Sequence, residues 1–438
     1  MAPTQNIDAL VKSVIMTDDL STKQKLVGEI HTAAKAQGIF LSSIHDVYMA
    51  RGKGQGKLFT TPAMNLRTMT YDLARAVFRV AKRTNAGAFI FEIAKSEMGY
   101  TGQPPIEYTG VVLAAAIKEG FSGPVFIQGD HCQIKAVSYF ENKAKEVGAL
   151  KDLVQDAIAG GFYNIDIDSS TTVKLDRPNL TEQQRDNFEI CAELTKFIRK
   201  IQPKGIMVSI GGEIGEVGGK NSDVHELKAF MDGYVASLGG AVRISKISVQ
   251  TGTSHGGVVL PDGTIAKVKV DFDALRDLSK FAKEKYSLGG AVQHGASTLP
   301  DEAFNTFAEI GTIEIHLATN FQNMVLDSKK IPEELCKKIV EWTKANCASE
   351  RKSSDTEEQF IYKSRKKALG PFKKEIMGLP DSVRDAIAAD IEKNFEFLFR
   401  KLSVNDTRAF VNNVIKPVDI ELGVDREAAA VLDGEGDD

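Results

Sequence analysis

Short apolar runs alternate with longer amphipathic stretches through most of the chain. Each run has the length and the β-branched or aromatic content of a buried strand, and each stretch carries apolar residues at helical spacing. The predicted strands cover residues 58–63, 88–93, 124–129, 163–167, 206–210, 246–250, 291–293 and 313–317. The predicted helices that follow them end near residues 83, 119, 160, 201, 238, 286, 310 and 346. Eight strand–helix units in series predict an α/β protein with a (β/α)8 TIM barrel rather than an open sheet.

Two helical extensions flank the predicted barrel. Residues 6–50 carry apolar clusters at helical spacing, and helical patterns return in residues 360–376 and 382–402. The basic, glycine-rich loop of residues 51–57 lacks the P-loop pattern, so we interpret it as a solvated linker rather than a phosphate-binding loop. The expected parts are an N-terminal helical extension (1–57), a catalytic barrel (58–346) and a C-terminal helical extension (347–438) with an acidic tail at 433–438.

Composition and charge narrow the class of protein. The chain of 438 residues has a hydrophobic content of 42% and a formal net charge of −4. That charge gives no reason to expect nucleic acid or an anionic membrane surface as a partner. The four cysteines include no CxxC pair, and no apolar run approaches the roughly 20 residues that a membrane span requires. We therefore expect a cytoplasmic protein without a nucleic-acid or membrane partner.

Three of the predicted strands end on a histidine. His131, His255 and His294 follow the third, sixth and seventh strands. In a parallel barrel the carboxyl ends of the strands meet at one mouth, so these imidazoles are expected to lie close together. Neutral imidazole suits zinc, and three protein ligands leave a coordination position for a substrate oxygen. Gly256 and Gly295, next to two of the histidines, allow the backbone to approach a ligand closely.

Residues after the seventh and eighth strands are suited to phosphate. Gly295, Ser297, Ala318 and Thr319 offer backbone N–H groups and hydroxyls where barrels commonly bind phosphate. The same segment would also serve as an ordinary helix N-cap, and the two interpretations are compatible. Other polar residues expected at strand ends are Asn65, Glu92, Asp130, Asp168, Glu213 and His316.

Taken together and in order, these segments resemble those of the class II, metal-dependent ketose-bisphosphate aldolases. The resemblance covers roughly residues 58–370. Gly129-Asp130-His131-Cys132 resembles the segment with the family's proton-transfer aspartate and a zinc ligand, and Gly252–Gly256 resembles the segment with the second ligand. His294-Gly295-Ala296-Ser297 resembles the third-ligand and phosphate-binding segment. Leu317-Ala318-Thr319 is closer to the tagatose-bisphosphate branch of the family.

The resemblance adds two candidate metal contacts. Gly212–Gly219 is similar to a glycine-rich loop whose glutamate, Glu213 here, can touch the metal in an alternate position. Asp168 matches an aspartate that can join a second divalent or monovalent cation. The implied cofactor is one catalytic zinc ion with His131, His255 and His294 as its ligands.

Two positions depart from the family pattern. The family usually has an acidic residue soon after the paired glycines, on a flap used for proton transfer. The chain reads Lys220-Asn221-Ser222-Asp223 there, so Glu216 or Asp223 would have to take that role. His316 stands where the family has an asparagine that contacts the donor ketone. Both departures bear on the substrate more than on the metal.

The expected activity is reversible cleavage of a phosphorylated ketose, similar to fructose- or tagatose-bisphosphate, into dihydroxyacetone phosphate and an aldehyde. Zinc would stabilise an enediolate, and Asp130 would transfer the proton. A Schiff-base aldolase needs a desolvated lysine at a strand end, and Lys95 and Lys135 do not occupy one. The predicted contacts to substrate or phosphate are Asn65, Gly256, Gly295, Ser297, His316, Ala318 and Thr319.

Two alternatives stay open. The first is a metal-dependent sugar epimerase or isomerase, which would keep the metal and the enediolate without cleaving a carbon–carbon bond. The second is a non-catalytic partner subunit of a tagatose-bisphosphate aldolase, although retention of Asp130 and the three histidines argues against it. In each case we expect a homodimer or a higher homo-oligomer.

Overall fold

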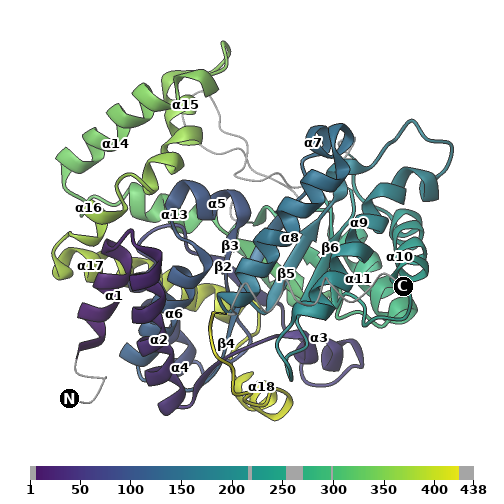
Figure 1. Ribbon diagram of the computed structural model, residues 1–438, viewed down its shortest axis with the longest axis horizontal. Coiled ribbons are helices and arrows are strands. Elements are labelled where there is room, and N and C mark those ends of the chain that lie inside the picture. Colours follow the sequence, from purple (N-terminus) through teal and green to yellow (C-terminus); the bar gives the residue numbers. More distant parts are fainter. Residues whose placement is uncertain (1–5, 216–219, 253–269, 297–298, 424–438) are drawn as a thin grey trace.

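Eight parallel strands close into a barrel within the part of the chain that the computed structural model describes, residues 6–215, 220–252, 270–296 and 299–423 (Figure 1). The strands are β2 (Thr61–Asn65), β3 (Ile90–Ala94), β4 (Gly123–Gln133), β5 (Asn164–Asp168), β6 (Ser209–Glu213), β7 (Lys246–Val249), β8 (Ala291–Gln293) and β9 (Glu314–Leu317). Each strand pairs with the next in parallel, and β9 pairs with β2. This closure confirms the predicted (β/α)8 barrel.

The helices after the strands form the outer layer. They are α4 (Thr70–Arg83), α5 (Lys95–Thr101), α6 (Pro105–Lys118), α7 (Ala136–Glu141), α8 (Lys143–Ala159), α9 (Leu180–Ile201), α10 (Val224–Leu238), α11 (Phe272–Tyr286), α12 (Phe304–Glu309), α13 (Thr319–Leu326) and α14 (Glu333–Asn346). Some of these helices begin with a side-chain cap, as at α9, where the side chain of Asn179 accepts the N–H of Glu182. None of the described helices is long and apolar enough to cross a membrane.

The N-terminal segment differs from the all-helical prediction by one strand. It contains α1 (Ile7–Met16), α2 (Leu20–Ala36), β1 (Ile39–Ser42) and α3 (His45–Gly52). β1 runs parallel to the first half of β4, with Ile39 opposite Gly123 and Ser42 opposite Phe126. The sequence Ile-Phe-Leu-Ser favours a strand, and the helical interpretation was wrong because it overlooked so short a run between two helices. The segment thus extends the sheet at the amino end of β4.

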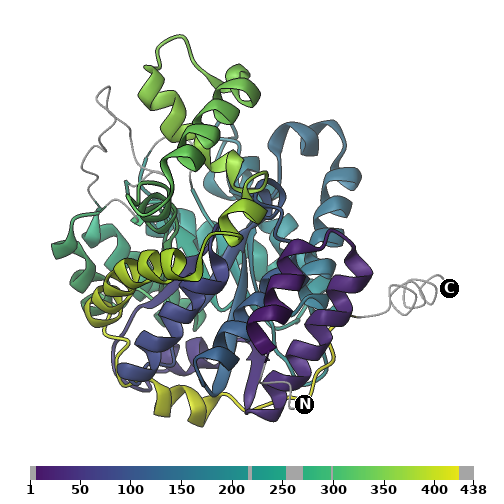
Figure 2. The same cartoon turned by 90° about the vertical axis from the view of Figure 1, so that its left-hand side faces the viewer.

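The C-terminal segment wraps one side of the barrel (Figure 2). Its elements are α15 (Glu357–Ser364), α16 (Lys373–Met377), α17 (Asp381–Lys401) and α18 (Arg408–Val414), with short 3-10 turns at Ala348–Glu350 and Arg365–Leu369. α17 packs on α4, where Glu392 pairs with Arg79 at 2.7 Å and with Arg83 at 3.0 Å. The ring centroid of Phe399 lies 5.5 Å from that of Phe89, and Phe89 is at the centre of an aromatic cluster. The extension is therefore part of the hydrophobic core.

Candidate metal centre and active site

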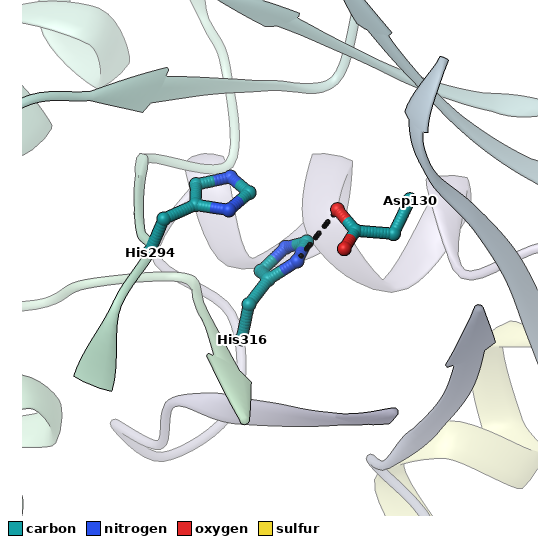
Figure 3. A group of neighbouring side chains, drawn as sticks. All are labelled: Asp130, His294 and His316. Atoms are coloured by element: carbon teal, nitrogen blue, oxygen red, sulfur yellow. Dashed lines mark ion pairs between the residues drawn. The ribbon is translucent and has the colours of Figure 1, made fainter. Parts of the chain in front are cut away.

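The carboxyl ends of the strands bring one acid and three imidazoles together at the mouth of the barrel. Asp130 and His131 lie near the end of β4, while His294 directly follows β8 and His316 lies in β9. Asp130, His294 and His316 are each at most 8% exposed, and they face one another (Figure 3). Their ligand atoms lie within 4.8 Å of one another. The ring centroid of His294 is 4.0 Å from that of His316 and 4.5 Å from that of His131.

An irregularity in β4 places two consecutive side chains in the mouth. Successive residues of a regular strand point to opposite faces, so Asp130 and His131 would normally diverge. The register between β4 and β5 shifts between Gly129 and Cys132, which marks a bulge. His131 has a φ of +41°, a left-handed conformation that residues other than glycine rarely adopt. The bulge explains how acid and imidazole share the mouth, at a cost in backbone strain typical of functional sites.

A carboxylate from β6 joins two of the imidazoles in a group that can hold a metal ion. His131, Glu213 and His294 offer ligand atoms that all lie within 4.8 Å of one another. Imidazole nitrogen and carboxylate oxygen are both zinc donors. Asp168 Oδ2 lies 3.3 Å from His131 Nδ1, and Ser248 Oγ lies 2.9 Å from His294 Nε2. Such outer partners orient ligating histidines, so the residues present fit a divalent metal.

The charges around Asp130 keep its carboxylate ionised. Burial alone raises the pKa of Asp130, but the imidazoles of His131 and His316 hold that pKa well below the usual range of a carboxyl group. Burial lowers the pKa of both rings, and the carboxylates around them raise it well above the ordinary histidine value. His316 Nδ1 lies 3.1 Å from Asp130 Oδ1 and 3.1 Å from Glu92 Oε2. Asp130 is therefore held in its ionised form in the mouth.

A buried ion cluster lies inside the barrel beneath the mouth. Lys246 opens β7 and has no exposed surface. Its Nζ lies 2.8 Å from Asp166 Oδ1 and 2.5 Å from Glu314 Oε1, and it donates to Gln128 Oε1 at 2.7 Å. Glu314 Oε1 also lies 2.7 Å from His316 Nε2, which joins the cluster to the mouth. Burial lowers the pKa of Lys246, but the two carboxylates raise it above its ordinary value, so this lysine is a charged group and not a Schiff-base nucleophile.

Sequence reasoning missed this cluster. Its signal was the presence of charged residues inside otherwise apolar strands, as at Asp166 and Glu314. A second signal was Gly211, where an added Cβ would lie 2.4 Å from Asp166 Oδ1 and 3.0 Å from Lys246 Cε. The glycine leaves room for the buried ion pair, which no strand pattern reveals on its own.

The remaining substrate candidates border the mouth. Asn65 is the last residue of β2, and its Nδ2 donates to Glu97 Oε2 at 2.5 Å. Gly295 follows His294 with a φ of +68°. Ala318 directly follows β9, and Thr319 is the first residue of α13. These residues therefore lie at the carboxyl ends of three strands.

Asp223, one of the two candidates for the flap acid, caps a helix. Its side chain accepts hydrogen bonds from the backbone N–H groups of His225 and Glu226 at the start of α10, and Glu226 completes a capping box. In this arrangement the carboxylate of Asp223 caps the N-terminus of α10. The other predicted residues Glu216, His255, Gly256 and Ser297 lie outside the described part of the chain. Their roles stay predictions.

Comparison with solved structures identifies the fold. A fructose-bisphosphate aldolase from Campylobacter jejuni is 17% identical, with a TM-score of 0.47 over 84% of this chain and 96% of that chain. A probable tagatose 6-phosphate kinase from Sinorhizobium meliloti is 13% identical, with a TM-score of 0.53 over 81% and 99%. A fructuronate-tagaturonate epimerase from Cohnella laeviribosi is 12% identical, with a TM-score of 0.50 over 90% and 86%. At such identity the likenesses with TM-scores of 0.53 and 0.50 show the fold alone.

Comparison with family models goes further. No curated protein gives a match to the sequence. The model of the family described as fructose-bisphosphate aldolase class-II matches residues 53–378, which include the whole barrel and part of the C-terminal segment. The chain therefore belongs to the class II fructose-bisphosphate aldolase family.

Proposed function

We propose that the protein is a zinc-dependent aldolase. It would reversibly cleave a phosphorylated ketose, similar to fructose- or tagatose-bisphosphate, into dihydroxyacetone phosphate and an aldehyde. The observation that carries this proposal is the group of His131, Glu213 and His294 beside the ionised Asp130, in a chain of the class II aldolase family. An aldolase-type lyase needs a cation site and a proton acceptor within reach of the same substrate carbon.

The metal would be held by imidazoles from three strands. His131 and His294 supply two of them, and we propose His255 as the third. Zinc, when bound, supplies a positive charge that polarises a substrate carbonyl. Glu213 would take an alternate metal position, and Asp168, 3.3 Å from His131, would orient that ring and contribute to a second cation position.

Asp130 would move the proton during cleavage. The carboxylate is ionised in the mouth, and it would accept the hydroxyl proton as the carbon–carbon bond breaks and return it in the condensation direction. His316 would act within the substrate site by fixing this carboxylate, because its Nδ1 already faces Asp130 and its Nε2 faces Glu314. Either Glu216 or Asp223 would supply the acid of the family's flap.

The phosphate end of the substrate would lie at the ends of β8 and β9. The proposed contacts to substrate or phosphate are Asn65, Gly256, Gly295, Ser297, His316, Ala318 and Thr319. We further propose a cytoplasmic homodimer or higher homo-oligomer without nucleic-acid or membrane partners. We also propose that the chain has three parts: an N-terminal extension (1–57), a catalytic barrel (58–346) and a C-terminal extension (347–438).

The test separates bond formation from proton exchange. The enzyme is incubated with zinc, dihydroxyacetone phosphate and a panel of short aldehydes, and donor consumption and solvent deuterium entry into the donor are followed separately. Aldol product with at least one aldehyde supports the proposal. Neither product nor exchange, together with interconversion of free sugar epimers, would overturn it in favour of an epimerase.

An epimerase is the second candidate. The observation in its favour is His316, an imidazole held between Asp130 and Glu92 where the aldolase pattern has a neutral amide. A second ionisable group beside the proton acceptor suits proton transfer at a carbon without bond cleavage. The fold of the epimerase from Cohnella laeviribosi is compatible with that chemistry.

A further inference from the structure

The end of the barrel opposite the metal centre holds a second charged cluster. Arg51 lies in the last turn of α3, which leads to β2, and Lys283 lies in the last turn of α11, which leads to β8. Both side chains therefore belong to the face where the strands begin. α3 is at the lower end of the barrel in Figure 1, whereas α7, after β4, is at the upper end.

The backbone around these two cations is closely packed. A Cβ on Gly52 would lie 2.6 Å from the carbonyl oxygen of Leu288, so the end of α3 abuts the turn before β8. Lys283 Nζ donates to the carbonyl oxygen of Gly311, before β9, at 2.8 Å. A Cβ on Gly290 would lie 3.1 Å from Lys283 Cε. Arg51, Lys283 and three glycine-containing turns thus converge at the starts of β2, β8 and β9.

Both cations lie against neutral groups in the described part of the chain. Arg51 is 4% exposed, its guanidinium lies 4.8 Å from the ring centroid of Phe59, and its Nε has no hydrogen-bond partner among the described residues. Within the described ranges no carboxylate forms an ion pair with Arg51 or Lys283. Burial lowers the pKa of Arg51 to about 10. Burial and the charge of Arg51 lower the pKa of Lys283 to about 8, so both groups still carry charge at neutral pH.

We propose that Arg51 and Lys283 form a binding site for an oxyanion, the phosphate or carboxylate group of a small ligand, on the barrel face opposite the metal centre. Two like charges, one buried and one half-buried, without a carboxylate partner among the described residues are unfavourable, and a bound anion would compensate both. A guanidinium binds phosphate or carboxylate through two parallel hydrogen bonds, and an ammonium adds a point charge.

This site changes the interpretation of the basic loop of residues 51–57. The sequence pattern favoured a solvated linker over a phosphate-binding loop, and no P-loop is present. Arg51, its first residue, belongs instead to the end of α3 and is buried. Lys53, at the C-cap position of α3, is exposed and would add positive charge at the rim. The proposal therefore rests on Arg51 together with a lysine more than 200 residues later in the chain.

The experiment measures binding of inorganic phosphate by calorimetry on the full-length protein, at constant ionic strength set with chloride. The variants are Arg51→Met and Lys283→Met, which keep most of the aliphatic volume, with Lys283→Gln as a second substitution. The matched control is Lys280→Met on the same helix, because the side chain of Lys280 is 68% exposed and only approaches Glu284 at 4.0 Å. Circular dichroism confirms that each variant is folded.

We expect each variant of Arg51 or Lys283 to bind phosphate at this site at least about tenfold more weakly, which corresponds to about 1.4 kcal/mol. Lys280→Met is expected to bind as the wild type does. If the mouth also binds phosphate, the wild type shows two sites and the variants retain one. If the mouth does not bind phosphate, the wild type shows one site and the variants show none. The experiment therefore distinguishes failure of the oxyanion site from failure of the proposed phosphate site at the mouth.

Competition identifies the kind of oxyanion. Glycerol phosphate and acetate are added in separate arms, and displacement of phosphate by the first alone indicates a phosphate site. Equal displacement by acetate indicates a site for carboxylates as well. Phosphate binding by Arg51→Met and Lys283→Met with the wild-type stoichiometry and affinity would overturn the proposal, as would a wild type without any site that these substitutions weaken.

Discussion

The two ends of the barrel hold buried charges of opposite character. At the mouth, carboxylates and imidazoles are in contact, with Asp130 3.1 Å from His316 and Asp168 3.3 Å from His131. At the opposite face, Arg51 is buried and Lys283 is half-buried, and neither has a carboxylate partner in the described parts of the chain. The mouth therefore presents groups that bind a cation, and the opposite face presents groups that bind an anion.

Two lysines show what decides the charge of a buried group. Lys246 is fully buried and Lys283 is half-buried, and burial lowers the pKa of each. Asp166 and Glu314 reverse that effect for Lys246, while Arg51 adds to it for Lys283. The partner, rather than the depth of burial, sets the sign of the shift. The consequences for activity and stability can be measured.

Among the substitutions considered, Asp130→Ala is expected to have the largest effect, and that effect is on catalytic activity. Loss of the proton acceptor lowers turnover by about 10²–10⁴-fold, the usual size of a general acid–base contribution. Metal content and the far-ultraviolet circular dichroism spectrum are expected to stay at wild-type values. Turnover equal to the parent would show that Asp130 does not transfer the proton, and a loss of metal would show that it positions His131 instead.

Lys246→Met is expected to have the largest effect on stability. It leaves the buried carboxylates of Asp166 and Glu314 with His316 but without their ammonium partner, which lowers the free energy of unfolding by about 3–5 kcal/mol. Lys283→Met is the control, since it removes a half-buried lysine that has no carboxylate partner among the described residues, and it should cost less than about 1 kcal/mol. Urea denaturation measures both. Equal losses in the two variants would contradict the distinction between the two environments.

Gly211→Ala is expected to destabilise the same ion cluster by a smaller amount. The added methyl group would lie 2.4 Å from Asp166 Oδ1, so the carboxylate must move away from Lys246. Overpacking of this kind lowers the free energy of unfolding by about 1–3 kcal/mol. Gly148→Ala, on α8, is the control, because no atom lies within 4 Å of the added Cβ. Urea denaturation in which both variants match the wild type would mean that the cluster adjusts freely.

The smallest expected effect is a dependence of stability on pH through Lys283. Its pKa is about 8 when folded and about 10.4 in an unfolded chain, so the unfolded state binds more protons between these values. Stability contributed by this group therefore rises as the pH increases from about 8 to 10, as the unfavourable charge beside Arg51 is lost. The difference in unfolding free energy between wild type and Lys283→Met should increase over that window. A constant difference would show that the folded pKa is not lowered.

Local patterns predicted the fold well where strands are apolar from end to end. The predicted bounds of the strand at 291–293 coincide with β8, and the helix predicted to end near residue 238 ends there as α10. β6 was placed three residues too early, because the strand continues through Gly211 and Gly212 into the polar mouth. β6 pairs with β7, with Gly212 opposite Ile247, and this pairing keeps both glycines in the strand. An apolar pattern does not include them. β1 was missed because its pairing with β4 is a tertiary contact.

The candidate site was predictable as a set of strand ends but not as a geometry. Strand order brings Asp130, His131 and His294 to one mouth, which follows from the parallel topology alone. The bulge that turns both Asp130 and His131 inward depends on the register between β4 and β5, which the sequence does not show. The pairing of Lys246 with Glu314 likewise joins residues 68 positions apart across the barrel interior. Such contacts arise only when the barrel closes.

Metal analysis of the purified protein tests the central claim most directly, namely that the mouth of the barrel is a zinc site. We expect about one zinc ion per chain in the wild type. The control variant His225→Ala should retain the same zinc content, because His225 is exposed on α10. His131→Ala is expected to lose both the metal and the activity. A wild type that is fully active without bound metal and insensitive to chelators, or a His131→Ala variant that retains its zinc, would contradict the account.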